Sequence, residues 1–189
     1  MLIMKNWLLI FFIIFSICTI NTFAADFDSM YDGAKPFDSK LFNDIDPYED
    51  EEAIKYAYSP NPLFRTSAFL YFKDFAIEPG YYSLAPRKLK GEYYVLFKQG
   101  GKVKFIIPIV KKEPTPIHFY EANTPQIYQT RIQKVANKVR NKFYNMSKSS
   151  MKIDPPKSLV NVEVEVKYII MTLYYGEDKF TLLFKRTPY

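Results

Sequence analysis

Few side chains in this 189-residue sequence are suited to covalent chemistry. The only histidine, His118, has an apolar residue on each side, which is typical of a packed side chain rather than of a general base. The only cysteine, Cys18, falls in an apolar N-terminal stretch, so no cysteine nucleophile or thiolate metal site is expected in the folded protein. Ser149 and Lys152 have the S-x-x-K spacing of some serine enzymes, but the companion S-D-N and K-T-G elements are absent. The sequence therefore predicts no catalytic residue, metal site or cofactor, and we do not expect an enzyme.

Carboxylates offer the one catalytic alternative, a hydrolase that works through a pair of acids. Such a pair needs burial to raise the pKa of the group that donates the proton. The acids crowd into an N-terminal arm that we expect to be mobile and solvated, so this alternative is the weaker one. A deep cleft that holds two sequestered carboxyl groups facing each other, or His118 against an acid, would overturn that judgement. The candidates are Asp26, Asp28, Asp32, Asp44, Asp46, Glu49 and Asp50.

A basic amphipathic helix is the sharpest feature for binding a partner. Apolar residues recur at helical spacing from Tyr128 to Met146, and no acid occurs between Ala122 and Ile153. Four cations follow one stripe beside the apolar one. This arrangement is typical of helices that bind an anionic membrane surface or an acidic protein or polymer. The cations are Arg131, Lys134, Lys138 and Lys142.

A second interpretation of this helix stays open. Its apolar side would then pack on the protein's own sheet, as amphipathic helices of globular proteins usually do. A short acidic helix, expected over about 47–58, would be an internal partner for the basic stripe. Asp46, Pro47 and Glu49 form a helix start with a capping box, and acids in the first turn suit the helix dipole.

The N-terminal residues predict export. Lys5 precedes an unbroken apolar stretch, and Thr22 and Ala24 occupy the −3 and −1 positions of a signal-peptidase site, so cleavage is predicted before Ala25. The alternative is an inner-membrane anchor formed by residues 7–24. Cleavage would leave no cysteine, which favours a bacterial periplasm over a eukaryotic secretory route. Export argues against a nucleic-acid partner despite a pI of about 9.1, and no recognised nucleic-acid motif is present.

The first of two expected hairpins turns at Gly100-Gly101. A two-residue turn there pairs Leu96 with Phe105 and places both on the core face, with the opposite face partly covered. Pro108 has no N–H group, so regular pairing should stop there or leave that strand at a sheet edge. The residues before the hairpin, 86–91, are expected to form a loop.

The second expected hairpin lies at the end of the chain and is centred on Glu177-Asp178, with one face wholly apolar. The strand before it alternates strictly and then shifts phase, which predicts a β-bulge near 167–168. The alternation directs four valines inward and glutamates outward. These are Val160, Val162, Val164 and Val166.

Together these elements predict an α+β, mainly β fold. Six to seven mostly antiparallel strands over residues 60–189 should form a small sandwich or a partly closed barrel with one long amphipathic helix. Before it come the signal peptide, residues 1–24, and an acidic arm with a short helix, residues 25–59. We therefore predict an exported cell-envelope protein of non-catalytic binding type. A small-amphiphile (lipid) binding β-domain is a further alternative, and the sequence does not predict the oligomeric state.

Overall fold

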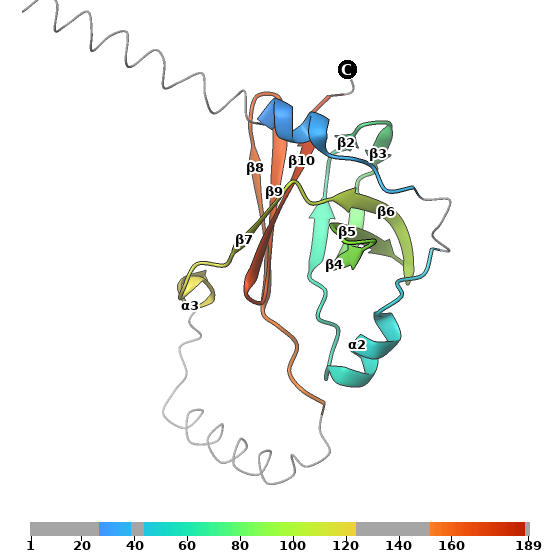
Figure 1. Ribbon diagram of the computed structural model, residues 1–189, viewed down its shortest axis with the longest axis vertical. Coiled ribbons are helices and arrows are strands. Elements are labelled where there is room, and N and C mark those ends of the chain that lie inside the picture. Colours follow the sequence, from blue (N-terminus) through green and yellow to red (C-terminus); the bar gives the residue numbers. More distant parts are fainter. Residues whose placement is uncertain (1–26, 39–43, 124–151, 188–189) are drawn as a thin grey trace, which may run out of the picture.

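Ten strands form two antiparallel sheets in the computed structural model, which describes residues 27–38, 44–123 and 152–187 (Figure 1). The described residues also contain helices α2 and α3, and residues 27–33 form a further helical segment. The strands are β1 Leu63–Thr66, β2 Leu70–Phe72, β3 Phe75–Ile77, β4 Gly80–Leu89, β5 Glu92–Gln99, β6 Lys102–Pro108, β7 Lys111–Pro114, β8 Ser158–Val164, β9 Tyr168–Tyr175 and β10 Asp178–Lys185, and the helices are α2 Glu49–Lys55 and α3 Phe119–Asn123.

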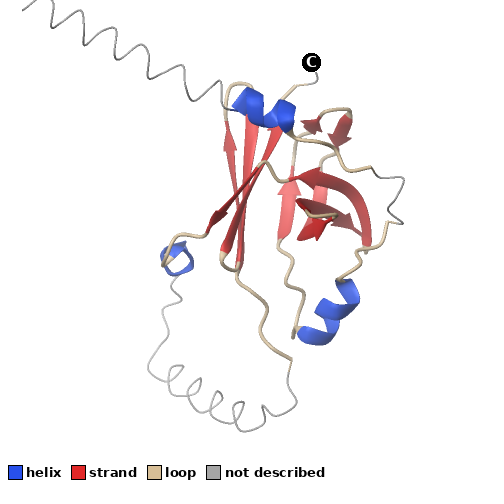
Figure 2. Cartoon of the chain, viewed as in Figure 1, coloured by secondary structure: helices blue, strands red, loops and turns tan. Residues whose placement is uncertain are grey.

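The two sheets face each other and neither closes on itself (Figure 2). One has four strands in the order β1-β4-β5-β6. The other has six, in the order β3-β2-β10-β9-β8, with β7 also paired to β10. The mainly β sandwich is confirmed, whereas the strand number was underestimated because β1, β3 and β7 are too short to show a periodic pattern. The long helix predicted between Tyr128 and Met146 lies outside the described residues.

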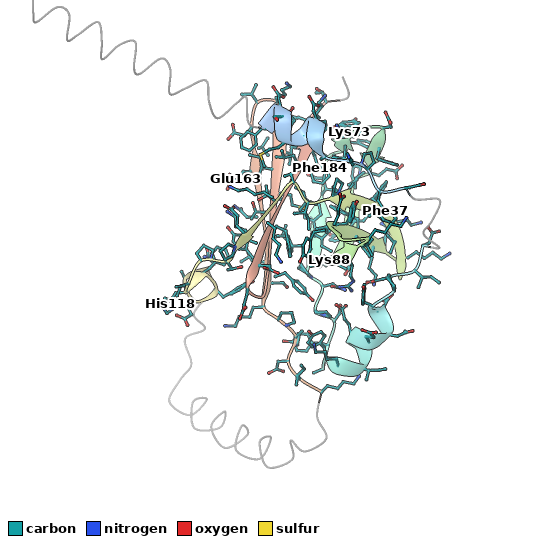
Figure 3. The ribbon with its side chains drawn as sticks, viewed as in Figure 1. Phe37, Lys73, Lys88, His118, Glu163 and Phe184 are labelled. Carbon is teal, nitrogen blue, oxygen red and sulfur yellow. The ribbon has the colours of Figure 1, made fainter. Side chains whose placement is uncertain are left out.

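Aromatic side chains fill the space between the sheets. Phe97 of β5 and Phe184 of β10 meet at a ring-centroid distance of 6.1 Å and an interplanar angle of 83°. Phe97 also contacts the rings of Phe64 and Tyr82 in its own sheet. Edge-to-face pairs of this kind are a favoured aromatic geometry. The rings therefore join the two sheets into one hydrophobic core (Figure 3).

The β5–β6 hairpin keeps the predicted turn but not the predicted faces. Gly100 and Gly101 take φ values of 60° and 76°, the left-handed region that glycine adopts without a steric cost. Beyond the turn, a register shift at Phe97/Lys98 sets Phe97 opposite Phe105 and Leu96 opposite Ile106. The prediction that Leu96 faces the core with Phe105 was wrong, because a bulge exchanges the faces of one strand relative to the other.

Leu96 belongs instead to a smaller apolar cluster on the other face of the four-stranded sheet, with Ala85 and Val103. Strand β6 ends at Pro108 and forms an edge of its sheet, as predicted. The expected loop over 86–91 was wrong, because β4 continues to Leu89. A buried arginine in that stretch is central to the site described below.

The C-terminal hairpin turns one residue earlier than predicted, at Gly176-Glu177, and pairs Asp178 with Tyr175. The change in register is two residues, so the predicted apolar face is kept, since side chains alternate with a period of two. Gly176 has a φ of 60°, which explains why the turn forms there.

A second turn replaces the predicted bulge near 167–168. Strand β8 ends at Val164, and the N–H of Glu165 donates to the carbonyl of Tyr168 at 2.8 Å, so the chain reverses into β9. As a result β8 is the outer strand of its sheet. The prediction that all four valines point into the core was wrong: Val160 packs on the core, but Val166 is 92% exposed.

Residues 27–33 are helical and pack on the core, contrary to the expected mobile arm. Tyr31 is 1% exposed, and its ring lies 5.6 Å from that of Phe72 and 5.5 Å from that of Tyr168. Its hydroxyl accepts a hydrogen bond from the N–H of Lys73 at 2.7 Å. The apolar residues Phe27, Met30, Tyr31 and Ala34 have helical i, i+3, i+4, i+7 spacing.

Candidate functional site

Arg87 is the centre of the most unusual polar site in the described residues. It lies on β4, on the face of the four-stranded sheet that carries Ala85 and points away from the second sheet. The residue is 7% exposed. Arginine is seldom buried to this extent unless it is paired.

Two carboxylates bind the Arg87 guanidinium in bidentate fashion. Nε donates to Asp46 Oδ1 at 2.9 Å, and Nη2 donates to Asp46 Oδ2 at 2.7 Å. Nη1 and Nη2 also donate to Glu52 Oε1 and Oε2, each at 2.7 Å. The guanidinium is the group best matched to a carboxylate by planar geometry, so this pairing fixes orientation as well as charge.

Lys98 extends the same network from the neighbouring strand. Its Nζ donates to Asp46 Oδ2 at 3.2 Å and lies 3.0 Å from Glu49 Oε2. The side chain of Asp46 is fully buried and those of both cations are 6% exposed. We refer to these five residues as the charge cluster: Asp46, Glu49, Glu52, Arg87 and Lys98.

The cluster favours the ionised forms of Asp46 and Arg87. Burial opposes the charge of Asp46, but hydrogen bonds and charge from Arg87, the Tyr48 amide and Lys98 outweigh it and hold the pKa of Asp46 below its usual value. Burial likewise opposes the charge of Arg87, and Asp46 and Glu52 reverse that effect and raise the pKa of Arg87. A carboxylate with a lowered pKa is a poor proton donor, so Asp46 is unsuited to act as a general acid.

The acidic helix supplies the carboxylates in a way that differs from the predicted cap. Helix α2 spans Glu49–Lys55, shorter than the expected 47–58, and its N-cap is Tyr48 without a side-chain hydrogen bond. Asp46 accepts the Tyr48 N–H at 3.2 Å and turns its carboxylate to Arg87. Glu49 pairs with Lys98 rather than completing a capping box. The acids that appeared to serve the helix end therefore bind the sheet.

A surface hollow of about 400 Å³ adjoins the cluster, lined by Tyr48, Glu52, Tyr56 and Arg87 among others. Tyr175 is nearby; burial and the charge of Glu52 raise its pKa, while Arg87 opposes that rise. The phenol therefore stays neutral at neutral pH. The hollow presents tyrosine rings and charged side chains of both signs, which can bind polar groups.

Helix α2 also fixes the point where the chain re-enters the described fold. The N–H of Ala57 donates to the Ile153 carbonyl, and the N–H of Ile153 donates to the Lys55 carbonyl, each at 3.0 Å. Lys152 Nζ donates to the Ala53 carbonyl. The charge cluster thus fastens α2 to the sheet, and α2 in turn fastens residues 152–153.

His118 is exposed, so the prediction of a packed side chain was wrong. Its Nδ1 lies 2.8 Å from Glu121 Oε2, and the two side chains are 74% and 73% exposed. His118 has a φ of 62° and lies at the outer end of the molecule, away from the core (Figure 3). This pair meets the condition that would argue for catalysis in one respect, a histidine against an acid. It lacks the other, because neither group is sequestered from water.

The remaining candidate acids do not converge. Asp28 accepts hydrogen bonds from Lys167 and Tyr168, and Asp32 lies 4.0 Å from Lys73. Asp44 and Asp50 are exposed. Among the described residues, no group of three or more histidine, cysteine or acidic side chains is placed to hold a metal ion. Six residues singled out in the sequence lie outside the described part of the chain: Asp26, Arg131, Lys134, Lys138, Lys142 and Ser149.

Two carboxylates of one site, the buried Asp46 and the half-buried Glu52, were not predicted as a pair. The two carboxylates do not contact each other directly, because the Arg87 guanidinium donates hydrogen bonds to both and lies between them. The signal in the sequence was the alternation of Ala85, Arg87 and Leu89 along a strand, which Pro86 concealed.

The comparisons with known proteins return no relatives: no family model, no curated protein and no solved structure matches the chain. The fold and the site define the chain only as a mainly β sandwich with a buried ion-pair cluster. In the described residues, no helix has both the length and the apolar character needed to cross a bilayer.

The charge cluster predicts acid-sensitive stability. Asp46 has a lower pKa in the folded chain than its ordinary 3.8, so its ionisation stabilises the fold above that value, and this contribution is lost as the pH falls below 3.8 toward the folded-state pKa. Asp46→Asn should be less stable than the wild type at neutral pH, and the difference should narrow in acid. Urea unfolding midpoints across the pH range measure this. A difference that stays constant with pH would show that the ionised carboxylate is not the stabilising species.

Proposed function

We propose that this chain is an exported cell-envelope protein of non-catalytic binding type, which engages an anionic membrane surface or an acidic polymer through the stripe of Arg131, Lys134, Lys138 and Lys142. One observation carries the proposal: three carboxylates of the acidic segment, Asp46, Glu49 and Glu52, are bound to Arg87 and Lys98 of the sheet. These acids of the internal partner that the sequence offered for the basic stripe are thus already engaged, whereas Asp50 and Glu51 of α2 are exposed. With fewer internal acids open to it, the stripe would attract an external anionic partner.

The attachment of the chain on either side of the stripe supports this proposal. On one side, Phe119 of α3 stacks on Tyr174 at a centroid distance of 3.8 Å, and the N–H of Thr115 donates to the Glu177 carbonyl at 2.8 Å. On the other side, Ile153 pairs with the end of α2. Both points lie at the same end of the sandwich (Figure 1). The chain therefore leaves and re-enters the fold at two fixed places.

The alternatives receive less support from the described residues. A carrier of small amphiphiles needs an open interior, but Phe97, Met171 and Phe184 fill the space between the sheets and are fully buried. A carboxylate hydrolase needs an acid with a raised pKa, whereas the pKa of the buried Asp46 is lowered. The first observation disfavours a carrier of small amphiphiles, and the second disfavours a carboxylate hydrolase.

Reversing two charges of the stripe tests the proposal. Lys134→Glu with Lys138→Glu should weaken co-sedimentation with anionic phospholipid vesicles by more than about tenfold, because each basic residue near such a surface contributes about 1 kcal/mol. The matched control is Lys102→Glu with Lys104→Glu, two exposed lysines of β6. This variant carries the same change in net charge and should bind nearly as well as the wild type. Equal losses in both variants would show a general charge effect, and no loss in either would refute the proposed surface.

A further inference from the structure

Strand β8 leaves an unpaired edge in the described part of the fold. It is the last strand in the order of the six-stranded sheet and runs over seven residues. The N–H of Glu165 donates to the Tyr168 carbonyl, and the N–H of Gly176 donates to the Lys157 carbonyl, each at 2.8 Å. In an antiparallel sheet, every second residue of a strand hydrogen-bonds to the same neighbouring strand. The odd-numbered residues of β8 therefore bond to β9, and the even-numbered ones face away from it. The backbone groups of Val160, Val162 and Val164 therefore point to the open side.

The same valines form an apolar row that becomes more exposed along the strand. Val162 pairs with Met171 and Val164 with Ile169, so their side chains continue the apolar inner face of the sheet. Yet Val162 is 40% exposed and Val164 is 63% exposed. A long edge strand that offers both free backbone groups and apolar side chains is a ready surface for strand pairing.

The charges on the other face of β8 restrict which strand can pair there. Asn161, Glu163 and Glu165 alternate with the valines, and Glu163 lies at the outer margin of the molecule (Figure 3). A partner strand that places acids opposite these glutamates is disfavoured, because like charges directly opposite one another repel. Parallel, in-register stacking of copies would set Glu163 against Glu163 and is disfavoured for the same reason.

We propose that β8 pairs with β8 of a second copy of this chain, antiparallel and centred on Val162. In this register Val162 faces its own counterpart and Val160 faces Val164, so the apolar rows match. Asn161 faces Glu163, and no glutamate faces another. The Asn161 amide already donates to Glu163 within the chain at 3.0 Å, and the same pairing of groups recurs across the axis.

Neighbouring registers are less complementary. A shift of two residues in one direction places Glu163 opposite Glu163. The opposite shift places Ser158 rather than a valine opposite Val164. The register centred on Val162 also allows the backbone hydrogen bonds to form, since it joins residues whose N–H and C=O groups both point outward. The contact is isologous: both copies use the same strand, β8. Association therefore stops at two copies and leaves neither β8 edge unpaired.

The oligomeric state of the full chain tests this inference. Analytical ultracentrifugation at increasing concentration should show a monomer–dimer equilibrium. Val162→Lys places two like charges at the axis and should weaken association by about tenfold or more. The matched control is Leu63→Lys, at a 70% exposed residue on β1, the edge strand of the other sheet, and it should leave association unchanged. Circular dichroism verifies that each variant folds.

Cross-linking tests the register independently of affinity. In a Cys18→Ser background, Val162→Cys should form covalent dimers on oxidation, because paired residues at the axis have Cα atoms about 5.5 Å apart. Val164→Cys should form few, because its counterpart lies four residues away along the strand, about 13 Å. A monomer at every concentration, association unaffected by Val162→Lys, equal cross-linking of both cysteine variants, or growth into larger polymers would overturn the inference.

Discussion

Arg87→Met is expected to lower the free energy of unfolding by about 3–5 kcal/mol, because removal of one partner from a buried ion pair leaves the other charge uncompensated. The variant keeps an unbranched apolar stem at this position but removes the Arg87 donors to Asp46 and to Glu52. The buried Asp46 carboxylate would retain only Lys98 and the Tyr48 amide. Urea denaturation followed by tyrosine fluorescence or circular dichroism gives the value.

The same substitution elsewhere on the same sheet is the control. Arg65 of β1 is exposed, and its guanidinium lies over the ring of Tyr81, at 5.5 Å. Arg65→Met should change the free energy of unfolding by no more than about 0.5 kcal/mol, as is usual for surface substitutions. Both variants make the same chemical change, and the two arginines differ in burial and ion pairing. A difference between their free energies of unfolding therefore reports the effect of burial and pairing.

A triple variant separates the loss of the ion pair from the loss of packing. Arg87→Met combined with Asp46→Asn and Glu52→Gln removes the orphaned charges, so it should be more stable than Arg87→Met alone. If the triple variant is as unstable as the single one, the guanidinium stabilises the fold through its shape and not through charge compensation. If Arg87→Met is nearly neutral, the cluster contributes nothing to the attachment of α2.

The sequence was informative about the fold wherever a local rule was sufficient. The Gly100-Gly101 turn, the termination at Pro108 and the apolar face of the last hairpin follow from residues close together in the chain. The bulge at Phe97/Lys98 leaves no such local mark, because residues on both faces of β5 are apolar and either register buries them. The β8–β9 turn over 165–167 was missed because it contains neither glycine nor proline.

The charge cluster was beyond sequence reasoning for a different reason. Asp46 and Arg87 are 41 residues apart, and Asp46 carries a complete local explanation as a helix cap. When a local interpretation accounts for a residue completely, the sequence gives no reason to look for a long-range partner. Lys98 lies opposite Ser83 on the neighbouring strand, four residues along the ladder from Tyr94, the partner of Arg87, and the two cations meet only through Asp46. Predicting such a site requires the strand register, and the Pro86 signal argued against that strand.

Phe97→Ala is the second large effect, with an expected loss of about 3–5 kcal/mol in the free energy of unfolding. The ring is fully buried and contacts Phe64, Tyr82 and Phe184, so its removal opens a cavity and breaks the contact between the sheets. Phe69→Ala, at a ring that is 45% exposed, is the matched control and should cost about 1 kcal/mol or less.

A double-mutant cycle makes this prediction specific to the observed bulge. Phe97→Ala and Phe184→Ala should be coupled by about 0.5–3 kcal/mol, because the two rings touch across the sandwich. Leu96→Ala and Phe184→Ala should be additive to within about 0.5 kcal/mol, because Leu96 packs on the opposite face with Ala85 and Val103. Without the bulge, Leu96 would share the core face with Phe105 and the coupling would be reversed. Strong coupling of Leu96 to Phe184, with none for Phe97, would therefore show that β5 presents its other face to the second sheet.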